Sequence, residues 1–292
     1  MWHAENVRIA ARLAVFSAAL PLLADPRTQK LLDRLAEEAS AFASTAPNLI
    51  ARETLKQRAV KTGGKRRFHP RVQTSTGQPE GPEWQTREIQ SEYAFAALGD
   101  PPSIRELRKV LSVDGAPVSE SDKALADLLR ALRSNDDRTR RKLLEDFEKH
   151  GLVGAATDFG QLILLFTRAS QEQYEYTFRA NKLLGADWCV VFQYKQHEGP
   201  GALTVFGAKG RQRPQISGEI WVSRQSYRPL RITLVSTRLE DTESVRDEAE
   251  VDYAMTTHGV VAPTAVNHRE FRKGQLVAEN HYTYTPFQKF GS

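Results

Sequence analysis

The chain has 292 residues, of which 40% are hydrophobic and 26% are charged, a composition that permits one large domain or two smaller ones with an ordinary core. A net charge of +5 and a pI near 9.3 make it moderately basic. The basic residues are not gathered on one element, so the charge alone identifies no partner. Cys189 is the only cysteine, which excludes an internal disulfide and a cysteine-based metal site.

Residues 1–24 have the pattern of an export signal. Arg8 and Arg12 precede an apolar run from Leu13 to Leu23, and Ala24 offers a small residue for cleavage. The run is too short to span a bilayer comfortably, and no cysteine follows it that could carry a lipid anchor. We therefore expect a periplasmic protein that is exported and not lipid-anchored. The alternative is a short N-terminal helix on a cytoplasmic protein.

The next segment predicts an amphipathic helix. Asp25 is a good N-cap, and Pro26 suits the first helical position. Apolar side chains then recur on one face through about residue 43: Leu31, Leu32, Leu35, Ala36, Ala39 and Phe42. Such a helix must lie against an apolar surface.

Three strands are predicted next, at 49–60, 88–98 and 104–113. The stretch 61–87 between the first two is rich in Gly, Pro, Ser, Thr and basic residues, which indicates a long mobile loop. Its basic side chains could contact phosphates or an anionic membrane surface, or have no partner; export argues against nucleic acid. The cluster comprises Lys56, Arg58, Lys61, Lys65, Arg66, Arg67 and Arg71, with Phe68 and Trp84.

A helical insertion is predicted over 119–168. Its first helix begins at Ser119, and its second covers about 139–150 and ends at Gly151. A third is expected to begin near Asp158 and to include 161–166, which is apolar on nearly every side. A helix of that kind is normally buried on several sides.

From residue 173 onward the pattern is that of β-strands. The clearest hairpin is 217–236, where two alternating runs flank a polar corner and Pro229 starts the second strand. Ile220 and Val222 point to the side opposite Trp221. The predicted strands are 173–182, 187–196, 202–208, 217–224, 229–238, 245–255, 261–272 and 275–285.

These elements predict an α+β fold with about eleven strands in one strongly curved antiparallel sheet, an incomplete barrel covered on one face by helices. Residues 25–292 are expected to form a single domain. Cys189 lies in an apolar strand, so we expect a buried, inert thiol. The acidic run 240–252 alternates with apolar residues, which favours a solvated strand face over a calcium or protein-docking site.

One group of residues resembles a metal site. His268, Glu270, Glu279 and His281 flank a tight turn at Lys273 and Gly274. A two-residue turn puts all four side chains on one side of the sheet, where they could hold zinc. A three-residue loop would instead turn His268 and Glu270 away from Glu279 and His281. The expectation is a solvated cross-strand polar pair without a metal. The chain contains no nucleophile or nucleotide-binding motif, so we predict no catalytic residue, no metal and no cofactor.

The element order resembles the periplasmic lipoprotein-carrier superfamily, LolA/LolB-like and including the N-terminal part of the sigma-factor regulator RseB. The hairpin resembles that superfamily's own at Ile220, Trp221, Val222, Pro229, Leu230 and Arg231, and the preceding strand does so at Gly185 and 189–192. The resemblance covers nearly the whole chain from about residue 26. The long loop 61–87 and Ser223, where an acidic residue is common, depart from the pattern.

The resemblance implies a non-enzymatic carrier whose concave face, closed by helices, binds lipid or the acyl chain of a lipoprotein. The helices 27–43 and 158–168 are the expected covers, because exposed apolar surface costs roughly 25 cal/mol per Å². An alternative is a filled barrel that docks an envelope protein as an interaction or sensor module. The expected lining of a hydrophobic cavity is Leu35, Phe42, Leu162, Leu165, Phe166, Phe178, Val191 and Trp221.

Overall fold

The computed structural model describes residues 26–61, 82–98, 103–134, 137–152, 158–197, 205–207, 210–212, 215–240 and 243–290. The predicted export signal, Asp25 and most of the predicted loop (62–81) lie outside these residues. Among the helices within them, none is both long and apolar enough to cross a bilayer.

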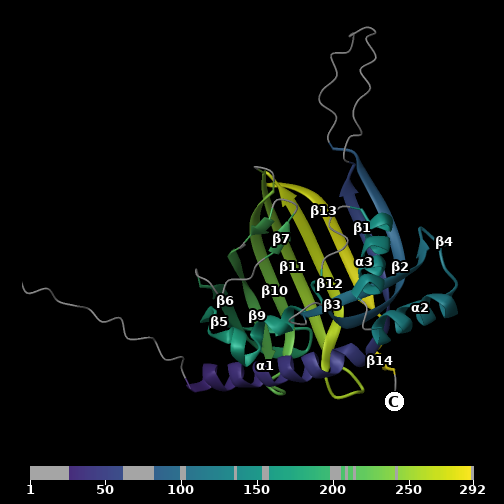
Figure 1. The fold of residues 1–292 in the computed structure, drawn as a ribbon. Coiled ribbons are helices and arrows are strands. Elements are labelled where there is room, and N and C mark those ends of the chain that lie inside the picture. Colours follow the sequence, from purple (N-terminus) through teal and green to yellow (C-terminus); the bar gives the residue numbers. More distant parts are fainter. Residues whose placement is uncertain are drawn as a thin grey trace, which may run out of the picture.

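Twelve strands form one antiparallel sheet, which is strongly curved and does not close among the described residues (Figure 1). The strand order is β4-β3-β2-β1-β13-β12-β11-β10-β9-β6-β5, and β14 also pairs with β1. The predicted incomplete barrel is therefore confirmed. The strands are β1 (Leu49–Val60), β2 (Trp84–Leu98), β3 (Ser103–Val113), β4 (Ala116–Pro117), β5 (Tyr174–Leu184), β6 (Asp187–Gln196), β9 (Gln215–Ser223), β10 (Pro229–Glu240), β11 (Glu243–Met255), β12 (Val261–Arg272), β13 (Gln275–Tyr284) and β14 (Gln288–Lys289). A separate pair consists of β7 (Val205–Gly207) and β8 (Gly210–Gln212).

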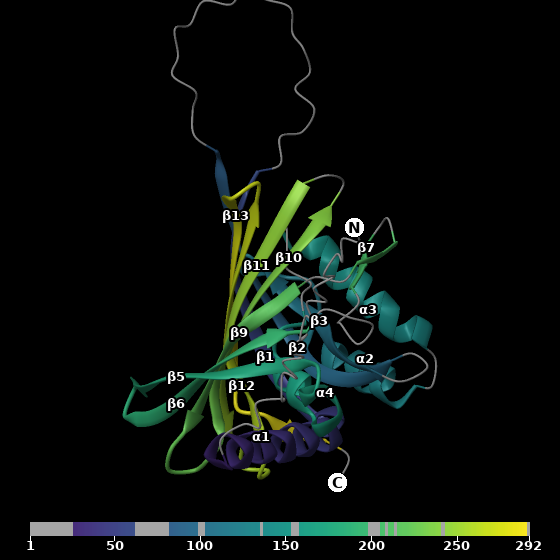
Figure 2. The same cartoon turned by 90° about the vertical axis from the view of Figure 1, so that its left-hand side faces the viewer.

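The leading helix α1 (Pro26–Thr45) crosses one end of the sheet on its concave side (Figures 1 and 2). A short 3-10 helix, η1 (Ala46–Asn48), connects it to β1. The predicted apolar face of α1 is confirmed, because its members are at most 7% exposed. Phe42 contacts Phe95 of β2 edge to face, with ring centroids 5.1 Å apart. The helix is thus held by burial of one stripe of side chains.

Two helices of the insertion, α2 (Ser121–Arg133) and α3 (Asp137–His150), pack against β2 and β3. A second, smaller core joins them to the sheet, with Leu107 of β3 against Leu128 and Leu143. Because side chains alternate along a strand, Leu107 points to the opposite side from Arg108, which belongs to the concave face. The sequence had not indicated this second core.

The third predicted α-helix does not form. The chain instead makes a turn and then a 3-10 helix of 5 residues, η2 (Leu162–Phe166), followed by α4 (Arg168–Gln171). In an α-helix the N–H of Ile163 would bond to the carbonyl of Phe159; here it donates to the hydroxyl of Tyr253. The expected burial is confirmed for Leu162, Ile163 and Phe166.

The hairpin of β9 and β10 has the predicted arrangement. Ile220 and Val222 are buried together with Ile232 and Leu234, all on the concave side. Gly218 is required where the two strands approach, since a Cβ there would lie 2.0 Å from the carbonyl oxygen of Thr233.

The predicted loop 61–87 is too long at its C-terminal end. Strand β2 begins at Trp84, which pairs with Val60, so 84–87 belong to the sheet. The guanidinium of Arg58 lies 4.2 Å from the Trp84 ring centroid, a cation–π contact. Lys56 and Lys61 of the predicted basic cluster are also described, whereas Lys65, Arg66, Arg67, Phe68 and Arg71 lie outside the described residues.

Candidate functional site

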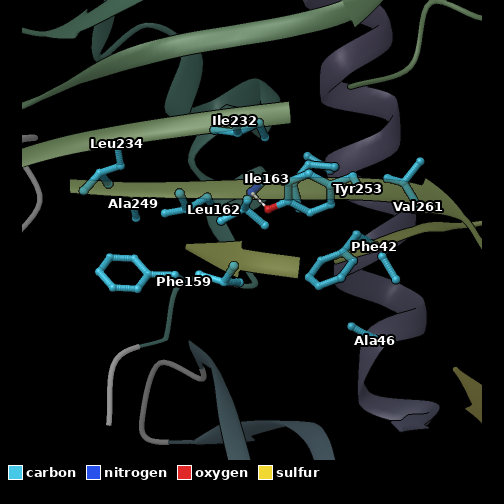
Figure 3. Packing of buried hydrophobic residues seen from close by; sticks show 14 of the residues in the cluster. Phe42, Ala46, Phe159, Leu162, Ile163, Ile232, Leu234, Ala249, Tyr253 and Val261 are labelled. Atoms are coloured by element: carbon cyan, nitrogen blue, oxygen red, sulfur yellow. Dashed lines mark hydrogen bonds between the residues drawn. The ribbon is translucent and has the colours of Figure 1, made fainter. Parts of the chain in front are cut away.

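The concave face of the sheet and the two segments that cover it form the candidate site. One cover is α1, and the other we call the lid segment (Asp158–Gln171), which contains η2 and α4. The covers are tied together, because the Gln171 side chain donates to the carbonyl of Leu32 at 2.6 Å. Together with the sheet they enclose the main hydrophobic core (Figure 3).

Tyr253 of β11 attaches the lid segment to the sheet. Its hydroxyl accepts a hydrogen bond from the N–H of Ile163 at 3.1 Å and donates one to the carbonyl of Gly160 at 3.1 Å. Figure 3 shows the ring of Tyr253 reaching from the sheet toward Ile163. One side chain thus satisfies two backbone groups that the short 3-10 helix leaves without helical partners.

The structure brings together Leu35, Phe42, Leu162, Phe166 and Leu165 of the predicted lining. The first four are buried in the main core, and Leu165 is partly buried against it. Phe166 lies between two tyrosines of the sheet, 4.9 Å from the Tyr194 ring and 5.9 Å from that of Tyr174. These residues all belong to the covers, whose burial followed from their apolar faces.

The predicted lining residues of the sheet need correction. Val191 pairs with Trp221, and both lie on the face opposite Ile220. Trp221 donates to Glu219 at 3.0 Å and lies beneath the ammonium of Lys182. Alternation along the strand carries both side chains to the face opposite the main core, where Val191 is fully buried.

Phe178 does lie on the concave side, but beyond the core. It lies on the edge strand β5, pairs with Phe192 of β6 and is 52% exposed. The concave face is formed by Phe192 and Tyr194 instead, which the sequence analysis missed. The alternation of β6, with Ile220 as the reference for the buried side, would have identified them.

A group of charged residues is buried in the concave face. Arg108 is 2% exposed and donates to both carboxylate oxygens of Glu53, at 2.8 and 3.0 Å, and to Glu106 at 2.5 Å. Asp158 of the lid segment lies 3.8 Å from Arg108 and 2.5 Å from Arg105. The cluster therefore joins two strands of the sheet, β1 and β3, to the start of the lid segment. Two buried carboxyl groups share one buried guanidinium, so negative charge would be in excess if both were ionised.

Two polar atoms in this cluster have no hydrogen-bond partner among the described residues: Oε1 of Glu106 and the hydroxyl of Tyr93. Both face Gly160, where a Cβ would lie 3.0 Å from the Glu106 oxygen and 3.1 Å from the Tyr93 hydroxyl. Burial raises the pKa of Glu106 to about 8, against the opposing attraction of Arg108. Burial thus favours the protonated form of Glu106, which has a hydroxyl donor beneath the lid segment.

The four residues of the possible metal site are separated. Arg272 pairs with Gln275 as a two-residue turn requires, but a bulge after Glu270 shifts the register. His268 therefore pairs with Asn280, while Glu279 and His281 project from the other face. Among the described residues, no three His, Cys, Asp or Glu side chains are close enough to hold a metal ion.

His268 is 1% exposed within a polar network on the concave face. Its Nδ1 accepts from the Asn280 amide at 2.9 Å, and its Nε2–H donates to Asp247 at 3.1 Å. Burial lowers the pKa of His268 to about 4, so the ring is neutral at physiological pH. The imidazole is a structural component of the sheet, saturated by protein partners.

Cys189 lies in β6, and most of the acidic run 240–252 lies in β11. Cys189 is fully buried, and burial raises the pKa of its thiol. Val245, Ala249 and Val251 of the acidic run are buried on the concave side, as predicted, while Glu250 is partly exposed on the other face. The thiol contributes no reactive group to the concave surface, whereas the acidic strand contributes Asp247, which binds His268 there.

Neither a protein-family model nor a curated protein matches the chain. Among solved structures it is similar to one described as an outer membrane lipoprotein-sorting protein domain from Vibrio parahaemolyticus, with 9% identity and a TM-score of 0.40 over 90% of this chain and 94% of that one. A DUF1329 family protein from Desulfovibrio piger has 10% identity and a TM-score of 0.38, over 90% and 92% of the two chains. A LolA superfamily protein from Nitrosomonas europaea has 8% identity and a TM-score of 0.29, over 89% and 94%.

Proposed function

We propose that the chain is a non-enzymatic carrier that holds lipid, or the acyl chain of a lipoprotein, on the concave face of its half-barrel. One observation supports this most: a discrete lid segment covers the concave face with apolar side chains, and its polar contacts with the sheet include the Tyr253 hydroxyl and the ion pairs of Asp158. A segment of that construction can be replaced without loss of the sheet itself.

The energetics permit such an exchange. Leu162, Ile163 and Phe166 are the fully buried contacts of η2, and burial of each contributes roughly 2–3 kcal/mol. A long acyl chain gains ~0.8 kcal/mol for each buried methylene, about 10 kcal/mol for a chain of ordinary length. An acyl chain would therefore offset the burial that these three side chains lose. The lid segment moves aside together with the part of α1 to which Gln171 binds it.

The carrier is proposed to work in the periplasm after export, to receive its cargo from an envelope membrane or protein, and to release it to a second one. The mass of the protein recovered from the envelope of an expressing cell tests the export step. A chain that begins near residue 25 would support processing at the predicted site, whereas an intact N-terminus on a cytoplasmic protein contradicts it.

Native mass spectrometry of gently purified protein tests the binding step. We expect adducts of lipid mass, and their loss in Leu165→Glu and Phe166→Glu, because a carboxylate in the cover would oppose entry of an acyl chain. Leu239→Glu is the control, since Leu239 is 64% exposed and outside the core. Bare protein after addition of lipid, or adducts that persist in both lid variants, would contradict the proposal.

A second candidate is a protein-interaction module with a permanently filled barrel. It is favoured by the complete burial of Ile163 and Phe166. Hydrogen exchange distinguishes the two functions: a carrier opens locally, so 158–166 should exchange faster than β10 and β11, whereas a solid core protects all of them equally.

A further inference from the structure

An exposed apolar surface lies at one corner of the molecule, apart from the enclosed core. Leu183 is 55% exposed, Trp188 is 57% exposed and Phe178 is 52% exposed, all on the hairpin of β5 and β6. Tyr227, which is 41% exposed, lies in the loop between β9 and β10. We call these four residues the hairpin patch. It contains most of the large, exposed apolar side chains among the described residues.

The strand register explains why these residues lie together. Leu183 and Trp188 are directly paired across β5 and β6, and both point to the same side as Phe192. The N–H of Arg224 bonds to the carbonyl of Trp188 at 2.8 Å, which fixes the Tyr227 loop beside the hairpin. Figure 2 shows the hairpin projecting beyond the body of the molecule, near α1. The patch is thus a protruding tip, not an open part of the core.

The surroundings of the hairpin patch are basic. The adjoining loop contributes Arg224 and Arg228, of which Arg228 also pairs with Glu38, whereas Arg179 and Lys182 contact Gln193 and Trp221 on the other face of the sheet. The ammonium of Lys30, near the start of α1, lies 5.1 Å from the centroid of the Tyr227 ring. Aromatic residues beside basic ones are typical of protein surfaces that enter the headgroup region of a bilayer.

The geometry points to an anionic phospholipid bilayer as the occupant of the hairpin patch, and we propose that this corner docks the protein on such a membrane. The size of the patch favours a bilayer over a protein partner. Four side chains of ~200 Å², each about half exposed, offer roughly 400 Å². One partner of a standard protein interface buries ~800 Å². A protruding tip with a basic margin needs no complementary surface in order to enter a headgroup layer.

The docking would place the start of α1 and the open edge strand β5 at the membrane surface. This inference goes beyond the proposed carrier function and rests on different residues. A protein that retains lipid but ignores vesicles would contradict the docking alone. A protein that binds vesicles but never carries lipid would contradict the carrier function alone.

Co-sedimentation with vesicles tests the proposal. The purified chain and its variants are compared on pure phosphatidylcholine vesicles and on vesicles with roughly one quarter phosphatidylglycerol. We expect the double variant Leu183→Ser, Trp188→Ser to bind the anionic vesicles at least ~10-fold more weakly, and Arg224→Glu about fivefold more weakly. Leu239→Ser, at the opposite end of β10, is the matched control and should bind like the unmodified chain.

A second measurement is independent of any other membrane contact in the chain. Brominated lipids should quench the fluorescence of Trp188, and Trp188→Phe should remove that quenching while preserving vesicle binding. The proposal is overturned if the hairpin variants bind as well as Leu239→Ser, if quenching is the same in Trp188→Phe, or if the patch instead mediates self-association that vesicles do not reduce.

Discussion

The hydroxyl of Tyr253 accepts a hydrogen bond from the N–H of Ile163 at 3.1 Å, and this contact joins the lid segment to the centre of the sheet. The same oxygen donates to the carbonyl of Gly160. A single side chain on β11 therefore determines the path of the segment that covers the concave face. The ion pairs of Asp158 with Arg105 and Arg108 and the bond from Gln171 to Leu32 add to this attachment.

Tyr253→Phe should loosen the lid segment. Two buried backbone groups lose their partner, which costs ~1–3 kcal/mol, so local opening should become about tenfold more frequent or more. Hydrogen exchange of 158–166 measures the change. Tyr194→Phe is the control, because it also removes a buried hydroxyl bond, to the carbonyl of Thr233, but leaves the lid contacts intact. Equal acceleration in both variants would contradict a specific role for Tyr253.

Gly160→Ala should displace the turn that precedes η2. The new methyl group would lie 3.0 Å from Glu106 Oε1, 3.1 Å from the Tyr93 hydroxyl and 3.2 Å from Pro263. Overpacking of this kind typically costs ~1–3 kcal/mol. We expect a lower free energy of urea unfolding and faster exchange in the lid segment. An alanine variant with unchanged stability would mean that the turn is not pressed against the buried cluster.

The stability of the protein should fall as the pH rises from 6.5 to 8. Burial raises the pKa of Glu106 from the usual 4.5 to about 8, so the folded chain retains a proton that the unfolded chain has released. Stability then declines with pH through that window, by at most ~1.4 kcal/mol per unit. His268 acts in the opposite sense at lower pH: its pKa is lowered from 6.5 to about 4, so its contribution makes stability rise with pH between those values.

Urea unfolding at several pH values measures this dependence. Glu106→Gln should reduce the decline between pH 6.5 and 8, although burial also raises the pKa of Glu53 and leaves part of the slope. His268→Gln should preserve the decline above pH 6.5 and extend it to lower pH, where the contribution of His268 opposes that of Glu106. A slope above pH 6.5 that is identical in Glu106→Gln and the unmodified chain would contradict the assignment.

The two histidines beside the turn at Lys273 should behave differently. His268 is buried between Asp247 and Asn280, so His268→Ala leaves a cavity and unmatched polar groups, at a cost of about 2–3 kcal/mol. His281 lies on the exposed face, where its ring forms a hydrogen bond with the side chain of Asn267. His281→Ala should therefore cost less than ~0.5 kcal/mol. Thermal unfolding compares them, and added zinc should shift the Tm of neither; a zinc-dependent rise would restore the metal site.

The strand positions and the leading helix could be predicted because their signals are local. Alternation over 217–236 identifies both strands and the buried side of each, and Pro26 with the stripe from Leu31 to Phe42 identifies α1 and its apolar face. Burial of the apolar residues in 161–166 followed in the same way, although the helix type did not, because Tyr253 lies about ninety residues away along the chain.

Of the candidate site, the sequence predicted the two covering segments but not the sheet residues that they contact. The sequence by itself determined that 27–43 and 161–166 must be buried, since each has an apolar surface too large to leave in water. Which sheet residues meet them depended on strand pairing, and a pairing shift by one residue exchanges the two faces. The bulge after Glu270 separated His268 from His281 for that reason. Only the tertiary structure could place Glu53, Glu106 and Arg108 in one buried cluster, because charged side chains enter a core only where distant strands bring their partners within reach.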